Sequence, residues 1–395
     1  MRWTASSKLD DANSAAVEFS LADLTGYTFV GQHRPHAKIQ FYGPFGEYVS
    51  MGNVSMQMCH QLVAHFDCLA IHNFIPSPWV DKRLEDYSGL NLKAPIGIFL
   101  GTPDAVPNIF YDHPISIGGF VCETDAINPL WVDVCNKLDL VFVPTFWCKQ
   151  AFTNSGVTTP IIVVPHGIEP EYRPAEGLLD HDTFVFYNTF HSSSLCSRKS
   201  LEELVRAFLN TFRHDEKVVL RLRTDASPKL AECQRKYNFS NKIEHVEMDY
   251  CSTQDFADLY STVHCTVHPS KGEGFGLIPF QSIACETPVL APHSTGMADY
   301  LNNQNSVAIA TAGRVTGEGV GNSHGTYFKI DEQDLQAKLR YMYNNWATEK
   351  KKVSAIGATF RAQHAWSTVL SDFIQLLDTL LAATPDQSAA ILNEL

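Results

Sequence analysis

The chain has 395 residues, of which 45% are hydrophobic and 18% charged, a composition typical of a globular protein and not of a disordered one. This length is long for a single core and sufficient for two domains. Thirty basic against 43 acidic residues give a net charge of −13, which argues against non-specific nucleic-acid binding but does not exclude a local basic groove.

The sequence contains neither a recognisable membrane span nor an export signal. No apolar run approaches the length of a transmembrane helix, and the opening residues, MRWTASSKLDDANSAAVEF, lack the apolar stretch of a signal peptide. The ten cysteines are scattered and include no CxxC pair. Free thiols in a reducing compartment are therefore expected, rather than disulfides or a zinc site, and we predict a cytoplasmic protein.

Strands and helices are predicted to alternate along the first half of the chain. Residues 1–36 precede the first clear strand and have no readable role. Most of the later β-rich runs are continuously apolar, as expected for parallel strands that are covered on both faces. The predicted strands are 38–43, 69–74, 95–101, 115–122, 140–144 and 161–165.

The same alternation restarts after a break. Residues 166–182, HGIEPEYRPAEGLLDHD, are rich in proline, glycine and acidic residues and are predicted to be an interdomain linker. The tail from about residue 331 is mostly helical. Strand–helix–strand order implies parallel sheets, so we predict an α/β protein of two doubly wound domains that bind ligands at the carboxyl ends of strands. The strands predicted for the second domain are 183–189, 217–224, 242–248, 265–270 and 288–292.

A basic pair follows the first strand of the second domain. In CSRKSLEELVRAFLNTF (196–212) the apolar residues share one helix face. Ser200 with Glu203 matches a capping box, which predicts that the helix begins at Ser200. Arg198 and Lys199 then lie just before its amino end, where free N–H groups and the helix dipole favour an anion. A pyrophosphate would suit this place, and the alternative is a pair of solvated loop charges.

A glycine-rich turn, SKGEGFGLIPFQSIACETPVL (270–290), follows the strand at 265–270 and leads into a helix from about Leu277. Its three glycines allow close backbone approach. A carboxylate at Glu273 would be repelled by phosphates, so neutral hydroxyls, such as those of a sugar, are its expected partners. Gln281 lies eight residues after Glu273, about two helical turns. Its side chain is therefore expected on the same side of the helix as the residues at the amino end.

EGFGLIPFQSIACETPVLAP resembles the donor-site signature of retaining GT-B glycosyltransferases, specifically family 4. That signature has two glutamates separated by seven residues, followed by a Gly-Thr-Pro-Val-type strand. Here Glu273 matches the first glutamate, Gln281 stands at the second, and Glu286 stands where a glycine is usual. The resemblance covers roughly residues 38–380, and its other segments are GFVCETDAINPLW, FVPTFWCKQAFTNSGVTTPIIVVPHGIEPEYRP, FYNTFHSSSLCSRKSLEELVRAF, STGMADYL and RAQHAWSTVLSDFIQLL.

The resemblance implies a GT-B fold, in which two Rossmann-like domains face each other across a cleft. Residues 1–167 would form the acceptor-side domain, with a terminal helix at about 372–395 crossing back to it, and 168–371 the donor domain. The implied activity is retaining transfer of a hexose or related sugar from a UDP- or GDP-sugar to a hydroxyl, without bound metal or cofactor. The acceptor class stays open: glycan, protein, lipid, small molecule or modified nucleic acid base.

The resemblance also implies roles for individual residues. Arg198 and Lys199 would neutralise the donor pyrophosphate, Glu273 would bind hydroxyls of the donor sugar, and Gln281 would hold the ribose. Other implied donor-binding positions are the backbone N–H groups of Gly274, Phe275, Gly276 and Leu277, Tyr250 near the base, and Gly52 with Gly43 and Gly46 in a loop of the first domain.

Acceptor-side candidates are Glu123 and Asp125, which follow the strand at 115–122, and His113, which precedes it. The alternative for Asp125 is that it caps the helix that contains Trp131. The histidines of HCTVH (264–268) are four apart on a strand, which predicts structural residues rather than a metal pair.

Two other functions stay open. The chain is alternatively a catalytically silent nucleotide-sugar-binding protein, with Gln281 and Glu286 as marks of lost activity. The third possibility is a sugar-nucleotide epimerase of the same fold.

Overall fold

The computed structural model describes residues 16–20, 28–45, 50–67, 69–72, 82–179, 182–191, 197–239, 242–247, 252–317 and 324–395. The chain divides into two compact units, one of residues 1–100 and 106–117 and the other of residues 101–105 and 118–395. This division runs through two strands of the first sheet. The functional boundary predicted between residues 167 and 168 stays a prediction.

The first sheet has six strands, and each overlaps a predicted strand. They are β3 (Ile39–Tyr42), β4 (Leu69–His72), β5 (Ile96–Gly101), β6 (Ile115–Phe120), β7 (Leu140–Val143) and β8 (Ile161–Val163). Their order is β4-β3-β5-β6-β7-β8, and the pairs β3–β4, β3–β5 and β7–β8 are parallel. This crossover order is that of a doubly wound sheet.

Helical segments connect these strands. They are α1 (Ser50–His65), α2 (Pro129–Cys135) and α3 (Phe146–Asn154), with the 3-10 turns η1 (Lys82–Tyr87), η2 (Pro103–Ala105) and η3 (Asn108–Asp112). The side chain of Asn128 caps α2 and accepts from the Trp131 backbone N–H at 2.9 Å. The idea that Asp125 caps this helix is therefore wrong. A short antiparallel hairpin, β1 (Ala16–Ser20) with β2 (Thr28–Gln32), lies where no strand was predicted.

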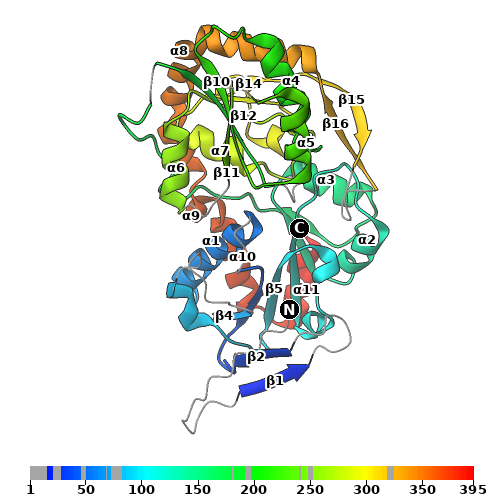
Figure 1. The fold of residues 1–395 in the computed structure, drawn as a ribbon. Helices are drawn as coiled ribbons and strands as arrows, with labels where there is room; N and C mark the ends of the chain where they lie inside the picture. Colours follow the sequence, from blue (N-terminus) through cyan, green and yellow to red (C-terminus); the bar gives the residue numbers. More distant parts are fainter. Residues whose placement is uncertain are drawn as a thin grey trace. The chain divides into compact units, whose positions relative to one another are not determined.

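The second sheet is also six-stranded (Figure 1). Its strands are β9 (Phe184–Thr189), β10 (Val218–Thr224), β11 (Ile243–Glu247), β12 (Cys265–Val267), β13 (Val289–Ala291) and β14 (Val307–Ala308). Their order is β11-β10-β9-β12-β13-β14, and every neighbouring pair is parallel. Five of these strands were predicted, and the two-residue β14 was not.

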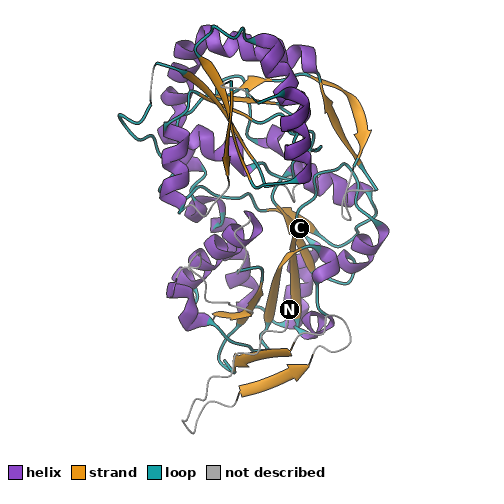
Figure 2. Ribbon diagram, in the orientation of Figure 1, coloured by secondary structure: helices purple, strands orange, loops and turns teal. Residues whose placement is uncertain are grey.

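Helices cover both faces of the second sheet (Figure 2). The helices that follow β9 in the chain are α4 (Leu201–Thr211), α5 (Pro228–Tyr237), α6 (Thr253–Ser261), α7 (Leu277–Ala284), α8 (Glu332–Gln363), α9 (Trp366–Val369), α10 (Ser371–Ala382) and α11 (Pro385–Asn393). On β9, Phe186 belongs to the core cluster that includes α4 and α8, whereas Val185 and Tyr187 belong to the cluster that includes α6 and α7. Burial on both faces explains the continuous apolar run of this strand.

The helices at the end of the chain pack back on earlier segments. The Phe373 ring of α10 lies 5.1 Å from the Phe142 ring of β7, and Ile168 forms a bridge with Ala365 just before α9. The segment predicted as a linker thus begins with residues held inside the fold, including the buried His166. None of the described helices combines the length and the apolar character that crossing a bilayer requires.

A second hairpin was missed by the sequence analysis. β15 (Thr311–Thr316) and β16 (Thr326–Ile330) pair in antiparallel fashion, with an irregularity between Thr311 and Arg314. β15 is largely exposed, so it lacks the apolar run by which the parallel strands were recognised.

Glu286, the departure from the usual glycine, occupies a position with φ of 58°. The left-handed region is easy for glycine and strained for other residues. The Glu286 carboxylate receives a hydrogen bond from Arg361 at 3.0 Å, and its carbonyl oxygen receives one from Lys350 at 2.7 Å. These contacts hold the residue in place, so glutamate here is compatible with the fold.

We expect Glu286→Gly to be more stable than Glu286→Ala by about 1 kcal/mol, because both lose the pair with Arg361 but only glycine relieves the left-handed strain. The measurement is urea unfolding of the two variants beside the wild type. Equal midpoints for the two variants would show that this backbone position carries no strain.

Candidate functional site

The carboxyl edge of the second sheet brings the predicted charged residues together. Arg198 and Lys199 lie between β9 and α4, and Glu273 lies between β12 and α7. β9 and β12 are neighbouring parallel strands, so both connections leave the same edge. The topology thus joins residues that are 74 positions apart in the chain.

Five side chains form what we call the charge cluster: Glu123, Arg198, Lys199, His268 and Glu273. The Lys199 ammonium pairs with Oε1 of Glu273, and Arg198 lies 3.3 Å from Oε2. Arg198 also reaches Glu123 at 3.5 Å and donates to the Gly272 carbonyl at 2.6 Å. The side chains of Arg198, Lys199 and Glu273 are only 6%, 10% and 10% exposed, so solvent screens these charges weakly.

Burial and mutual attraction decide the protonation states of the cluster. Burial by itself raises the pKa of Glu273, but Lys199 and Arg198 outweigh burial and hold that pKa well below its ordinary value. Burial lowers the pKa of His268, and Glu273 opposes this only in part. With His268 neutral, the two cations and the two carboxylates of the cluster balance, which is the condition for burying them together.

The helix after the basic pair begins differently from the prediction. Ser200 has a φ of 55° and its side chain makes no capping hydrogen bond, while Glu203 pairs with Lys271 at 2.8 Å instead of closing a capping box. The predicted capping box is therefore wrong. Because no side chain caps α4, the first-turn N–H groups keep their tendency to attract an anion.

The glycine turn has little space for larger residues. A side chain at Gly274 would meet Val121 at 2.1 Å, and Gly276 has a φ of 91°. The turn is held from outside by hydrogen bonds: Thr145 donates to the Gly274 carbonyl at 2.8 Å, and the Glu273 N–H donates to the Thr295 hydroxyl at 3.1 Å. α7 begins at this turn without a side-chain cap. This edge of the sheet therefore has two uncapped helix amino ends, those of α4 and α7.

Two of the predicted donor-binding residues use their side chains for packing. The buried Phe275 ring lies 4.7 Å from the His166 ring and 4.9 Å from the Phe280 ring, and the partly buried Leu277 packs against the same core cluster. The side chains of Phe275 and Leu277 are thus engaged in the core, and donor binding by their backbone N–H groups stays a prediction.

Gln281 lies two turns into α7 and outside the charge cluster. It is buried, and its Oε1 accepts a hydrogen bond from the Tyr260 hydroxyl of α6 at 3.2 Å. This bond orients the amide, with the oxygen toward Tyr260 and the NH2 group away from it. Tyr260 was not identified from the sequence, because no spacing rule links it to α7.

The acceptor-side candidates separate in the structure. Glu123 joins the charge cluster through Arg198. Asp125 instead holds the second hairpin, because its carboxylate accepts from the Thr326 N–H at 2.6 Å and from the Thr326 hydroxyl at 2.9 Å, and pairs with Arg314.

His113 belongs to the other compact unit, where both of its ring nitrogens are engaged. Nδ1 lies 2.9 Å from the Ala94 carbonyl and Nε2 lies 2.8 Å from the Tyr42 hydroxyl. Since a carbonyl only accepts, Nδ1 carries the proton and Nε2 accepts from Tyr42. Burial lowers the pKa of His113, which agrees with this neutral form.

Two of the remaining predicted positions, Gly43 and Gly52, belong to the first compact unit. Gly52 lies in the first turn of α1, and a side chain at Gly43 would meet Phe41 and Ser55 at 2.8 Å. Gly46 and Tyr250 lie outside the described residues.

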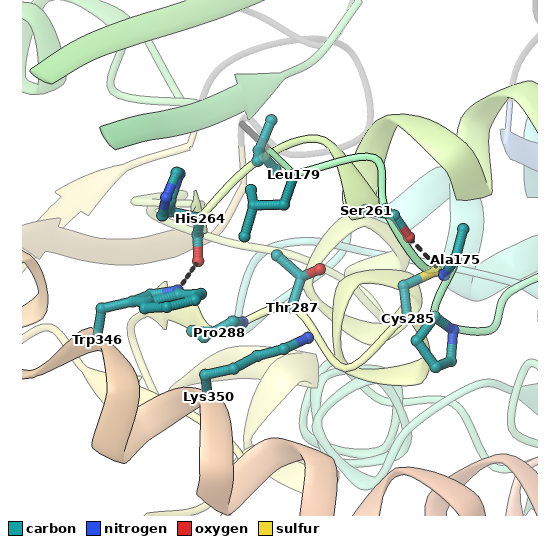
Figure 3. Close-up of a pocket in the computed structure, with 12 residues that line it drawn as sticks. Ala175, Leu179, Ser261, His264, Cys285, Thr287, Pro288, Trp346 and Lys350 are labelled. Atoms are coloured by element: carbon teal, nitrogen blue, oxygen red, sulfur yellow. Dashed lines mark hydrogen bonds between the residues drawn. The ribbon is translucent and has the colours of Figure 1, made fainter. Parts of the chain in front are cut away.

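A cavity of about 220 Å³ lies at the opposite edge of the second sheet (Figure 3). His264 and Pro288, which line it, directly precede β12 and β13. Its polar groups bond within the protein: Trp346 donates to the His264 carbonyl at 2.8 Å and Thr287 donates to the Tyr260 carbonyl at 2.7 Å. This cavity is therefore separate from the candidate site.

Solved structures with a similar architecture include glycosyltransferases. HepE from Anabaena, crystallised with UDP and glucose, has a TM-score of 0.66 at 13% identity, over 87% of this chain and 100% of that one. Sucrose-phosphate synthase from Thermosynechococcus elongatus has 0.64 at 13%, over 88% and 100%. WaaG, a glycosyltransferase involved in lipopolysaccharide biosynthesis, has 0.61 at 11%, over 90% and 99%. The chain has the GT-B fold, as predicted.

A family model matches the part of the chain that carries four of the five residues of the charge cluster. Residues 196–373 match the family described as "Family 4 Glycosyltransferase in conflict systems". No curated protein matches the chain. Residues 196–373 are therefore similar to family 4 glycosyltransferases, as the motif around Glu273 indicated.

The charge cluster predicts how stability depends on pH. We expect Glu273→Gln to lower the free energy of unfolding at pH 7 by about 3 kcal/mol, because it leaves two buried cations with one carboxylate fewer. Since the pKa of Glu273 is lowered in the folded state, its contribution is complete above the ordinary carboxyl pKa of about 4.3 and declines as the pH falls below that value.

Urea unfolding at pH 7, 5 and 3.5 tests this expectation. The difference between wild type and Glu273→Gln should be equal at the two higher pH values and smaller at the lowest. The double variant Lys199→Met/Glu273→Gln is the matched control, and it should recover part of the loss because it removes a cation together with the carboxylate. A difference that grows on acidification would contradict a lowered pKa for Glu273.

Proposed function

We propose that the chain is a retaining glycosyltransferase that moves a hexose or a related sugar from a nucleotide-diphosphate sugar to a hydroxyl acceptor. The observation that carries the proposal is the buried set of Arg198, Lys199 and Glu273, at the sheet edge where the uncapped amino ends of α4 and α7 also lie. Cations and helix amino ends suit phosphates, and a carboxylate suits hydroxyls. A nucleotide sugar has both groups next to each other.

In this proposal Arg198 and Lys199 bind the donor pyrophosphate. The bond between the anomeric carbon and the phosphate oxygen breaks with its electron pair on the oxygen, and the two cations stabilise that charge. The acceptor oxygen forms the new bond to the anomeric carbon, and its proton passes to the departing phosphate. Front-face attack of this kind gives retention, which is what the family resemblance implies.

Glu273 has a double role in this proposal. Without donor it neutralises Lys199 and Arg198. When phosphate oxygens share these cations, the Glu273 oxygens become available to sugar hydroxyls, to which a carboxylate makes charge-assisted hydrogen bonds. Repulsion between carboxylate and phosphate is limited because the two cations lie between them.

The proposed donor is a UDP- or GDP-sugar, and UDP-glucose is the first to try because HepE has been crystallised with it. Gln281 is proposed to hold the ribose, the backbone N–H groups of Gly274 to Leu277 to face the phosphate and sugar, and Tyr250 to lie near the base. Glu123 stays an acceptor-side candidate, whereas we assign Asp125 to holding the second hairpin.

The acceptor is a hydroxyl of unassigned class, and His113 stays an acceptor-side candidate. Gly52 stays a proposed donor-binding position. We propose that transfer needs no bound metal. A cytoplasmic location is proposed from the cysteines, because those of the described residues are free and buried thiols, as in proteins of reducing compartments.

A panel of UDP-, GDP- and ADP-sugars tests the proposed function. Slow hydrolysis of one donor, unaffected by EDTA, is the expected result. Binding without turnover would favour the silent binding protein, for which Gln281 and Glu286 are the supporting features. Conversion of one nucleotide sugar into another would favour the epimerase.

Lys199→Ala should weaken binding of the nucleotide sugar that the panel identifies as the donor. The loss should be about ten- to a hundredfold, because one charge-assisted hydrogen bond to phosphate is lost. Calorimetry measures this affinity. Lys271→Ala is the matched control, since Lys271 lies near but pairs with Glu203 outside the cluster. Unchanged donor affinity in Lys199→Ala would remove the phosphate role from Lys199.

Gln281→Ala should raise the donor KM about two- to tenfold with little change in kcat, because a neutral hydrogen bond to the ribose contributes about 0.5–1.5 kcal/mol. Tyr260→Phe should have a smaller effect in the same direction, since it removes only the hydrogen bond that orients the amide. An unchanged KM in Gln281→Ala would show that the residue does not contact the ribose. If only Gln281→Glu transfers sugar, the wild type is the silent binding protein.

A further inference from the structure

His268, one of the histidines predicted from the sequence to be structural, is a member of the charge cluster. It directly follows β12, its side chain is 2% exposed, and its Nε2 lies 3.0 Å from Oε1 of Glu273. Its backbone N–H donates to the Leu290 carbonyl at 2.8 Å, so the position of His268 is set by the parallel sheet. The signal in the sequence was a histidine at the end of a strand, five residues before Glu273.

The direction of the hydrogen bond follows from the charges. Glu273 is a carboxylate, which only accepts, so the Nε2–H of His268 donates. Burial keeps the imidazole neutral by lowering its pKa, and the two nearby cations act in the same direction. His268 is thus a neutral donor to Glu273, whereas Lys199 and Arg198 are charged ones.

This difference matters once phosphates are present. A pyrophosphate attracts Lys199 and Arg198 strongly, and both have long side chains that can turn toward it. A neutral imidazole on a short side chain is attracted much less. Of the three groups that hold Glu273, His268 is therefore the one that the phosphates leave in place.

We infer that His268 is a positioning residue, which holds the Glu273 carboxylate toward the donor sugar while the pyrophosphate engages the two cations. The inference rests on the proposed function, since it needs a donor that carries both a sugar and phosphates. It also predicts different effects on the two parts of the donor. Loss of His268 should weaken contacts with the sugar and leave contacts with the nucleotide diphosphate unchanged.

The test compares UDP-glucose with UDP by calorimetry in the wild type and in His268→Leu. We expect affinity for UDP to change little and affinity for UDP-glucose to fall about tenfold, because charge-assisted hydrogen bonds from Glu273 to the sugar are misaligned. In turnover the loss should appear in kcat as well as in KM. A merely structural residue would lower both affinities together, and this result would overturn the inference.

His268→Gln and His268→Asn form a matched pair that also serves if the leucine variant does not fold. Glutamine places its NH2 group near the position of Nε2, so His268→Gln should keep most of the affinity that glucose adds. Asparagine is too short, so His268→Asn should lose that affinity. Equal behaviour of the two amides toward UDP-glucose would refute the positioning role.

The outcomes separate this inference from the proposed function. If the wild type binds none of the nucleotide sugars in the panel, the proposed function fails and the inference fails with it. If the wild type binds UDP-glucose more tightly than UDP, and His268→Leu keeps that difference, only the inference fails.

Discussion

Arg198 and Lys199 are buried beside Glu273, and such charges remain in a protein interior only when each is paired and hydrogen-bonded. Several segments of the chain supply the partners of these charges. Neighbouring parallel strands bring the basic pair and the acid to one sheet edge, and the Gly272 carbonyl accepts from Arg198. Glu123 completes the balance from the connection after β6. A cluster assembled from three separate connections depends on the correct position of each, which ties the geometry of the site to the packing of the unit that contains it.

The glycine turn shows how the backbone serves this electrostatic arrangement. The carbonyl of Gly274 accepts from Thr145, and the carbonyl of Glu273 accepts from the Gly296 N–H at 2.9 Å. Their carbonyls therefore point into the protein, and the amino end of α7 keeps its N–H groups uncapped. Thr295, beside Gly296, has a φ of 55°, a left-handed conformation that a non-glycine residue adopts only when its surroundings hold it. The carbonyl groups of the turn are thus fixed by hydrogen bonds within the protein. The electropositive N–H groups at the amino end of α7 remain for an anion.

The parallel strands and the charged pair were readable from the sequence because local patterns determine them. Strand β9 is buried on both faces, which leaves a continuous apolar run, and the basic pair stands just before an amphipathic helix. Other features depend on contacts that no local pattern contains. The exposed strand β15 has no apolar run, and Asp125 holds its hairpin through residues about 200 positions away. Ser200 and Glu203 have the spacing of a capping box, but a salt bridge from Lys271 and a left-handed backbone at Ser200 override that local preference.

Gln281 and Glu286 differ from the residues of the family signature, a difference that would fit lost activity. Both residues nevertheless make specific contacts within the fold. Glu286 occupies a left-handed position and is held there by Arg361 and Lys350. Gln281 accepts from Tyr260 in the interior, where a glutamate would be a further buried carboxylate beside a tyrosine hydroxyl. Burying such a charge without a cation is costly. The neutral amide is therefore the side chain that this interior accommodates, and it keeps one donor for a ligand hydroxyl. In this chain the carboxylates of the site are Glu123 and Glu273, and both are paired with Arg198.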